Sequence, residues 1–125
     1  MPKIQSNGIN LHYEIHGEGQ PLLFIHGLGS STRDWEFQVT EFAKSYKVIT
    51  LDLRGHGQSD KPKGPYSMSM FAADVTGLLR GLGIDRVHVI GLSLGGGVAF
   101  QMAVDAPQIL KSLTIVNSTP ELIVR

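Results

Sequence analysis

Apolar and polar residues alternate near the start of the chain and then give way to nearly continuous apolar runs. Asn7-Gly8 is a dipeptide favoured in two-residue hairpin turns, and apolar residues occupy every second position from Ile9 to Ile15. This period of two predicts an antiparallel hairpin with one buried face. The later apolar runs are typical of strands buried on both faces of a parallel sheet. They cover residues 22–25, 48–53, 87–90 and 113–116.

Three segments between or after these runs carry apolar residues at helical spacing. The first, residues 31–43, has Ser31 or Thr32 as its N-cap, the second begins after Ser67, and the third follows Ser93 and ends before Pro107. Their apolar faces are formed by Trp35, Val39 and Phe42; by Phe71, Val75, Leu78, Leu79 and Leu82; and by Val98, Met102, Ala103 and Ala106. A hairpin followed by strand–helix alternation predicts an α/β fold. Its sheet should be mainly parallel, with helices on both faces and an antiparallel N-terminal hairpin.

Ser93 lies between the third apolar run and the third helix, in Gly91-Leu92-Ser93-Leu94-Gly95. A serine on a tight strand-to-helix turn has a strained backbone and an exposed hydroxyl, and flanking glycines leave room for the reversal. The Leu94 N–H at the start of the helix would face any negative charge that forms beside this hydroxyl. The position therefore predicts a nucleophile elbow, although the five residues alone also fit a glycine-rich packing turn.

Two further loops should meet Ser93 at the carboxyl edge of the sheet. In His26-Gly27-Leu28-Gly29 the glycines allow a sharp turn, and the Leu28 N–H would join that of Leu94 in a two-donor oxyanion hole. The other loop spans residues 52–59 and contains Asp52, Arg54 and His56. We interpret it as a turn held by side chain–backbone hydrogen bonds rather than as a set of catalytic groups.

These three motifs resemble the α/β-hydrolase family, in the family's order and over the whole chain. The resemblance implies that Ser93 is the nucleophile and that the amides of Leu28 and Leu94 are the oxyanion donors. The residues that support the motifs are His26, Gly27, Gly29, Asp52, Arg54, His56, Gly91 and Gly95. Within the family the chain is most similar to esterases, enol-lactonases and C–C bond hydrolases. Ser93 disfavours relatives with an aspartate nucleophile, such as haloalkane dehalogenases and epoxide hydrolases.

The chain departs from the family in one respect. Family members place an acid and then a histidine after the serine, whereas all five histidines here precede Ser93. The acidic residues that follow are Asp105, on a helix, and Glu121. Some relatives place the catalytic acid at the position of Glu121, but we favour a surface residue there. His26 and His56 are disfavoured as substitute bases, because each belongs to a loop that the family uses structurally. We therefore expect residues 1–125 to form the N-terminal part of one hydrolase domain, truncated after its sixth strand.

Composition narrows the range of partners. The formal net charge is zero, which gives no indication of nucleic-acid binding, and no apolar run is long enough to span a membrane. The chain has no cysteine and no apolar signal core near Met1, so we expect a cytoplasmic protein. We expect a small-molecule substrate and no cofactor or metal. We also expect self-association through the exposed sheet edge formed by residues 113–116, which carry no charge.

A non-catalytic hydrolase-like protein that binds a ligand or partner remains the alternative. An intact serine elbow argues against it, because a binding module does not need a strained hydroxyl. Dinucleotide binding is excluded because Gly91-Leu92-Ser93 breaks the G-x-G-x-x-G pattern at its second glycine. Phosphate binding by a P-loop is excluded because no Gly-Lys-Ser/Thr is present.

Overall fold

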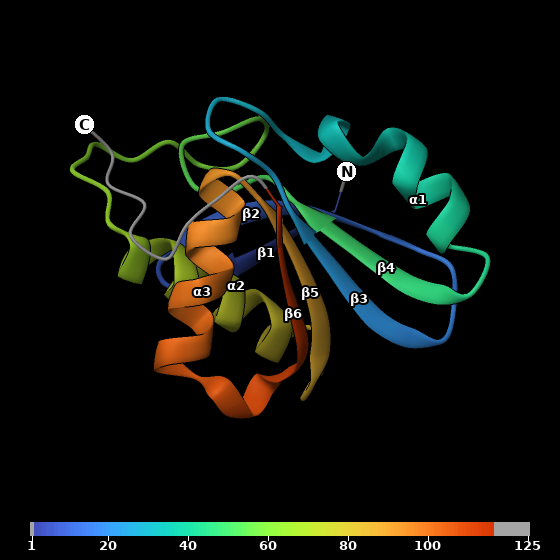
Figure 1. The fold of residues 1–125 in the computed structure, drawn as a ribbon. Helices are drawn as coiled ribbons and strands as arrows, with labels where there is room; N and C mark the ends of the chain where they lie inside the picture. The colour runs from blue at the N-terminus through green and yellow to red at the C-terminus, as the bar shows by residue number, and fades with distance from the viewer. Residues whose placement is uncertain (1, 117–125) are drawn as a thin grey trace.

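The structure is a computed structural model, and it describes residues 2–116. Strands and helices alternate after an initial pair of strands (Figure 1). The strands are β1 Lys3–Ser6, β2 Ile9–His16, β3 Gln20–Ile25, β4 Tyr46–Leu51, β5 Val87–Leu92 and β6 Leu110–Val116. The α-helices are α1 Glu36–Phe42, α2 Met68–Gly81 and α3 Leu94–Asp105, and short 3₁₀ turns cover Thr32–Trp35 and Pro107–Ile109.

Within the described residues the strands form one sheet in the order β1-β2-β4-β3-β5-β6. The pairs β1/β2 and β2/β4 are antiparallel, whereas β4/β3, β3/β5 and β5/β6 are parallel. Asn7 and Gly8 form the hairpin turn, both with positive φ, as a two-residue turn of this kind requires. The predicted α/β fold class, with its antiparallel N-terminal hairpin, is confirmed.

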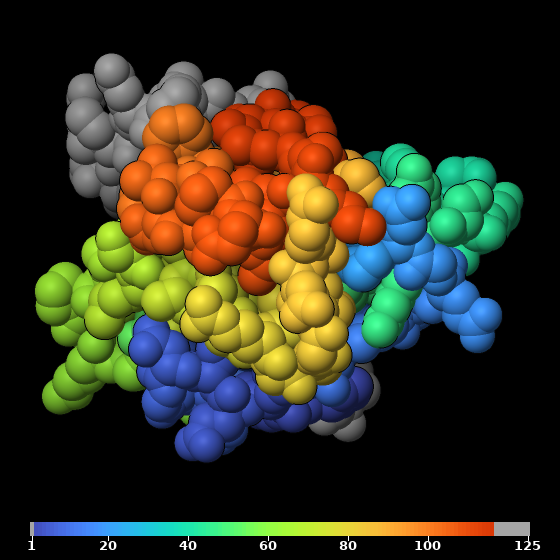
Figure 2. Space-filling view, turned by 90° about the horizontal axis from the view of Figure 1, so that it is seen from below, coloured from blue at the N-terminus to red at the C-terminus, as the bar shows by residue number. Residues whose placement is uncertain are grey.

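Helices lie on both faces of the sheet. On one face, α2 and α3 pack against alternate residues of the strands, including Leu23, Ile25 and Val89, in a large apolar core. On the other face, α1 and the turn before it cover a smaller cluster built around Leu22, Phe24, Trp35 and Val48. Seen from below, α3 and β6 in orange and red lie beside the start of β5 in yellow (Figure 2).

The segment predicted as one helix over residues 31–43 is a 3₁₀ turn followed by a shorter α-helix. Ser31 does cap the turn, since its side chain accepts a hydrogen bond from the Arg33 amide. The break falls at Trp35, whose φ of −109° and ψ of 10° leave the helical region. Trp35 is buried where it stacks on Phe24, with ring centroids 4.6 Å apart. Burial of this large side chain takes precedence over continuous helical geometry.

Other boundaries move by two or three residues. The strand predicted over residues 48–53 is β4, Tyr46–Leu51, and Leu53 is buried in the loop that follows. The strand predicted over residues 113–116 begins earlier, at Leu110. Ser67 caps α2 as predicted, by accepting a hydrogen bond from the Met70 amide at 3.1 Å. In the part of the chain that the structure describes, no helix combines the length and apolar content needed to cross a bilayer.

Candidate active site

Ser93 occupies the turn between β5 and α3 in a conformation that L-residues rarely adopt. Its φ is 53° and its ψ is −113°. Its amide donates to the Val116 carbonyl at 2.9 Å, which extends the pairing of β5 with β6 as far as the turn. Although Ser93 is the N-cap of α3, its side chain makes no capping hydrogen bond. The backbone is thus strained and the hydroxyl is not used to stabilise the helix.

Two glycines make this turn sterically feasible. A Cβ on Gly91 would collide with the carbonyl oxygen of Gly95, across the turn. A Cβ on Gly95 would collide with the carbonyl oxygens of Ile25 and His26, at the end of β3. The first turn of α3 can therefore lie directly against the end of β3, which brings Ser93 close to the loop after that strand.

That loop, His26-Gly27-Leu28-Gly29, lies beside Ser93. A Cβ built on Gly27 would be 3.5 Å from the Ser93 Cβ. Gly29 has a φ of 76°, so the sharp turn needs a glycine at this position. Leu28 itself is 67% exposed. The structure therefore brings together two of the loops that the sequence placed at one edge.

The amides of Leu28 and Leu94 are the donors that the sequence predicts for an oxyanion hole. Over residues 2–116, neither N–H donates a hydrogen bond to a protein acceptor. Leu94 is the first residue of α3, where the amide groups carry the partial positive charge of the helix. Leu94 is buried and Leu28 is largely exposed, so the two amides lie in different surroundings.

His26 is buried and uses both ring nitrogens in the scaffold. Nε2 accepts from the Leu53 amide at 2.9 Å, and Nδ1 donates to the Gly27 carbonyl at 2.7 Å. Burial lowers the pKa of His26, and its hydrogen bond to Gly27 opposes this only in part. His56 packs on the His26 ring at 4.9 Å between centroids, and its Nδ1 bonds to the Arg54 carbonyl at 3.0 Å. These contacts give both histidines structural roles.

Asp52 ties together the loops that follow β3 and β4. One carboxylate oxygen accepts from the Thr32 amide and the other from the Gln58 amide, each at 2.8 Å. The Ser59 hydroxyl donates to the Asp52 carbonyl, and the His12 amide donates to that hydroxyl at 2.9 Å. The loop over residues 52–59 is thus a turn held by side chain–backbone hydrogen bonds.

Arg54 anchors the same loop to α2 through a buried ion pair. Its Nε and Nη2 donate to the two carboxylate oxygens of Asp74, at 2.7 and 2.9 Å. These hydrogen bonds raise the pKa of Arg54. Asp74 is fully buried and also accepts from the Asn7 side chain at 3.0 Å. The pair holds the β4 loop against α2 in a planar, two-bond geometry.

Sequence reasoning missed two acidic residues that hold these loops. Asp74 lies three residues after Phe71 and four before Leu78, so it sits on the apolar face of α2, where a charge requires a partner. Its position on that face was the available signal. Asp34 accepts from the Gly27 amide at 3.4 Å and from the Ser30 hydroxyl, which fixes the turn after β3. No sequence signal set Asp34 apart from a helix N-terminal acid.

The structure brings no acid–base pair to Ser93 within the described residues. Asp105 lies at the far end of α3, where it accepts from Gln101 at 3.0 Å. Glu121 lies outside the described residues. A cavity of about 770 Å³ lies elsewhere, between α1 and the strands β2 and β4, and neither Ser93 nor Leu28 lines it. The polar residues that line it include Glu14, His16, Thr32, Glu36, Asp52 and Gln58.

Comparison with known families agrees with this geometry. A profile of the alpha/beta hydrolase fold matches residues 20–124, most of the chain. The chain belongs to the α/β-hydrolase family. An uncharacterized protein of Mycobacterium tuberculosis is 41% identical over 112 residues, which are 90% of this chain and 33% of the relative. This α/β-hydrolase chain therefore spans about a third of the length of that relative.

Solved structures of hydrolases superpose closely on the chain. An N-acyl homoserine lactone degrading enzyme, Est816, aligns with a TM-score of 0.90 at 38% identity, over 94% of this chain and 45% of its own. The epoxide hydrolase CorEH aligns with a TM-score of 0.94 at 38% identity, over 98% of this chain and 43% of its own. The α/β-hydrolase fold is thus shared by relatives whose names indicate different substrates.

Proposed function

We propose that this chain is the nucleophile-bearing part of a serine hydrolase that acts on an ester, lactone or similar small carbonyl substrate. The observation that carries the proposal is the conformation of Ser93. Its φ is 53°, its side chain makes no helix-capping hydrogen bond, and its Cβ lies beside Gly27. Over residues 2–116 the Ser93 hydroxyl makes no hydrogen bond that would offset the strain of this backbone conformation, which favours a catalytic role.

In the proposed reaction the Ser93 Oγ attacks the carbonyl carbon of the substrate. Its proton passes to a base, and the carbonyl oxygen becomes an oxyanion that the Leu28 and Leu94 amides stabilise. The intermediate collapses as the bond to the leaving group breaks, and the leaving alkoxide takes the proton from the base. Water then attacks the acyl-enzyme and gives a proton to the same base; the bond to the Ser93 Oγ breaks, the acid product leaves, and Oγ takes the proton back. We propose that residues beyond 125 supply the acid and histidine of this base.

Relatives with lactonase and epoxide hydrolase names match the chain about equally well, so similarity does not choose between the two reactions. The chemistry of Ser93 favours the first. Attack of a hydroxyl on a carbonyl gives an ester, which water can hydrolyse. Attack of the same hydroxyl on an epoxide would give an ether, which would leave the enzyme permanently alkylated. A serine elbow therefore favours carbonyl substrates.

Replacement of Ser93 by alanine tests the proposal in the complete protein, expressed with the residues that follow Arg125. Alanine should leave the melting temperature near its original value and lower kcat for p-nitrophenyl esters by more than about 1,000-fold, because no hydroxyl remains to form the acyl-enzyme. Serine at position 112, exposed on β6, offers a matched control: Ser112→Ala should keep full activity. Turnover above about a hundredth in the Ser93→Ala protein would exclude Ser93 as the nucleophile.

A second experiment asks whether residues 1–125 contain a base of their own. His26 has both ring nitrogens occupied and His56 has one, so we expect Ser93 in this chain to react only over hours with a fluorophosphonate probe. Mass spectrometry of the intact chain and its peptides would locate the label. Complete labelling of Ser93 within minutes would mean that a base lies within the chain and would contradict this part of the proposal.

A further inference from the structure

The cavity between α1 and the strands β2 and β4 has no part in the reaction proposed above, since neither Ser93 nor Leu28 lines it. Its volume of about 770 Å³ lies within the range of sites that hold small molecules. The chemistry of its walls indicates which kind of molecule it would bind.

Thr50 forms the innermost part of the cavity wall. It is 1% exposed, and it alternates along β4 with Ile49 and Leu51, which face the opposite core, so its side chain points towards α1. Its hydroxyl has no hydrogen-bond partner within residues 2–116, whereas the Thr40 hydroxyl on the α1 side donates to the Glu36 carbonyl at 3.1 Å. A buried hydroxyl without a partner is costly, so a ligand with a polar group would gain a hydrogen bond at Thr50.

Carboxylates stand on two opposite walls of the cavity. Glu14 belongs to β2 and has a side chain that is 30% exposed, whereas Glu36 is an exposed residue at the start of α1. His12 and His16 each contact one Glu14 oxygen at 3.2 Å. Burial raises the pKa of Glu14, but the hydrogen bonds from the two histidines outweigh it and lower that pKa. Glu14 is therefore ionised at neutral pH and held in place.

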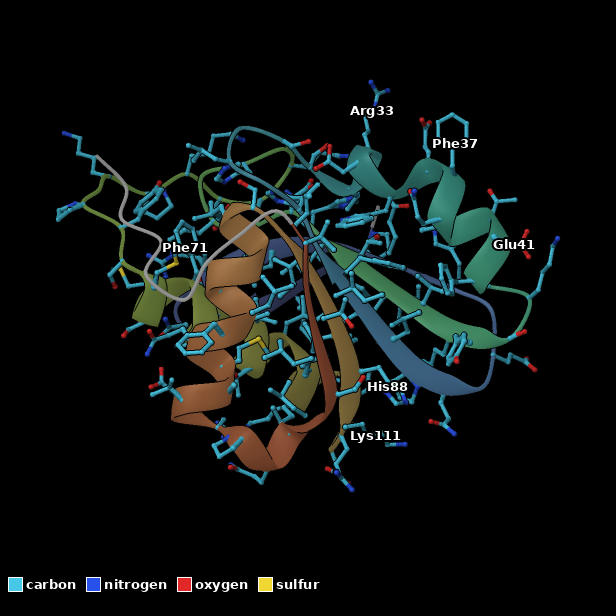
Figure 3. The ribbon with its side chains drawn as sticks, in the orientation of Figure 1. Arg33, Phe37, Glu41, Phe71, His88 and Lys111 are labelled. Atoms are coloured by element: carbon cyan, nitrogen blue, oxygen red, sulfur yellow. The ribbon has the colours of Figure 1, made fainter. Side chains whose placement is uncertain are left out.

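The negative charge of the cavity is spread out and lacks a counterion. Asp52 adds a third carboxylate to the walls, and of the lysines and arginines in the described chain only Arg33 lines the cavity. Figure 3 shows the Arg33 side chain pointing away from the sheet. Over residues 2–116, no three histidine or carboxylate groups stand close enough together to hold a metal ion. The walls therefore favour an extended cation with charges at separate points over a single metal ion.

We propose that this cavity is a second binding site, separate from the candidate active site, for a small aliphatic diamine. One ammonium group lies against Glu14 and donates to the Thr50 hydroxyl, and the other lies against Glu36 on the opposite wall. The methylene chain between them packs on Val39 and Ala43, the apolar residues that α1 and its end contribute to the lining. An ammonium group donates hydrogen bonds and accepts none, which matches walls of carboxylates and a hydroxyl.

Isothermal titration calorimetry of the complete protein with 1,4-diaminobutane tests the site. We expect one ligand per chain, bound at least about tenfold more tightly than 1-aminobutane, which has one ammonium group. The uncharged 1,4-butanediol should not bind. Equal binding of the diol and the diamine would overturn the proposal, and so would displacement of the diamine by an equal concentration of magnesium chloride. Absence of diamine binding would mean that water or residues beyond 125 occupy the cavity, and would also overturn it.

Three substitutions locate the diamine in the cavity. Glu14→Gln should weaken binding about tenfold and Glu36→Gln about threefold, because water screens the more exposed carboxylate. Thr50→Val keeps the shape of the side chain, removes the hydroxyl and should weaken binding about threefold. The control is Glu41→Gln, since Glu41 is on the same helix as Glu36 but points away from the sheet (Figure 3) and should not affect binding. Equal effects of Glu14→Gln and Glu41→Gln would show a response to overall charge and would contradict the site.

Two further measurements separate the cavity from Ser93 and do not depend on the cavity variants. Ser93→Ala should bind the diamine as tightly as the unaltered protein. Saturating diamine should change KM for a p-nitrophenyl ester less than about twofold, after subtraction of the rate without enzyme, because the cavity lies apart from Ser93. Competitive inhibition would place the diamine at Ser93 and overturn the proposal. In NMR spectra of the unaltered protein the amide signals of Thr32, Thr50 and Gln58 should shift on titration, and unchanged signals would overturn it as well.

Discussion

Helices α2 and α3 cover one face of the sheet with a continuous apolar core, whereas α1 and its preceding turn cover only part of the opposite face. On the α2/α3 face, Val87 and Val89 of β5 are fully buried. On the α1 face, Ile90 and Leu92 of the same strand remain partly exposed, and Val116 of β6 is 38% exposed. α1 and the 3₁₀ turn before it carry exposed side chains, and Figure 3 shows Arg33 of the turn and Phe37 and Glu41 of α1 pointing away from the sheet.

The difference shows which face of the sheet supports the candidate site. Gly95 packs against the end of β3, and Asp74 anchors the β4 loop through Arg54; both lie on elements of the α2/α3 face. Parallel sheets normally have both faces covered. The well-covered face therefore supplies the rigid support of Ser93, and over residues 2–116 the α1 face is covered less completely.

The largest expected effect is association of the chain through the sheet edge formed by β6. Over residues 2–116, β6 pairs only with β5, and residues 113–116 of this edge carry no charge. We expect residues 1–125 alone to associate at micromolar concentration, which corresponds to about 8 kcal/mol of association free energy. Size-exclusion chromatography with light scattering would measure it.

A charge on the edge sharpens this test. Thr114 is exposed on β6, on the α1 face of the sheet, so Thr114→Lys should shift the chain towards the monomer. Gln38→Lys adds the same charge to the exposed side of α1 and should leave association unchanged. A chain that is already a monomer with a cooperative melt would show that the edge does not drive association.

The second effect contrasts an ion pair on each face. Asp74→Ala removes the partner of buried Arg54 and should lower the free energy of unfolding by about 3–5 kcal/mol, because the guanidinium is left unpaired. Glu41 and Lys44 form a 3.5 Å pair at the end of α1, with both side chains about 70% exposed. Glu41→Ala should cost less than about 1 kcal/mol. Urea unfolding of both variants gives the comparison, and similar losses would contradict the assigned difference in support.

The smallest effect concerns pH. Burial lowers the pKa of His26 below its usual value of 6.5, so the unfolded chain binds a proton that the folded chain does not. The contribution of His26 to the free energy of unfolding is therefore fully present above pH 6.5. As the pH falls below 6.5, the free energy of unfolding decreases by up to about 1.4 kcal/mol per pH unit. Unfolding in urea between pH 8 and pH 5 should show this slope, and His26→Asn should reduce it. An unchanged slope in that variant would assign it to other groups.

Glu14 should cause a further loss of stability at lower pH. Partial burial raises its pKa, but hydrogen bonds from His16 and His12, each at 3.2 Å, outweigh burial and leave the pKa below 4.5. Its contribution to stability is present above pH 4.5 and is lost as the pH falls further. The two groups therefore act in different pH ranges, which allows their contributions to be separated.

Local patterns predicted most of the fold, because their signals lie within a few residues. The Asn7-Gly8 turn, the Ser67 cap and the glycines around Ser93 each act on neighbouring backbone. The segment around Trp35 was predicted less well. There the side chain packs against Phe24 of another element, and the helical spacing of its apolar residues carries no information about that contact.

The sequence by itself determined the succession of strands and helices along the chain and the position of Ser93 in a strand-to-helix turn. Periodicity and glycine placement act along the chain and can be read from it. Only the tertiary structure decided that Asp74 pairs with Arg54 and that Asp34 and His26 hold the Gly27 loop. It also decided that, over residues 2–116, one sheet face is only partly covered. Each of these depends on contacts between segments distant in sequence, where burial forces polar groups to find partners that no local pattern specifies.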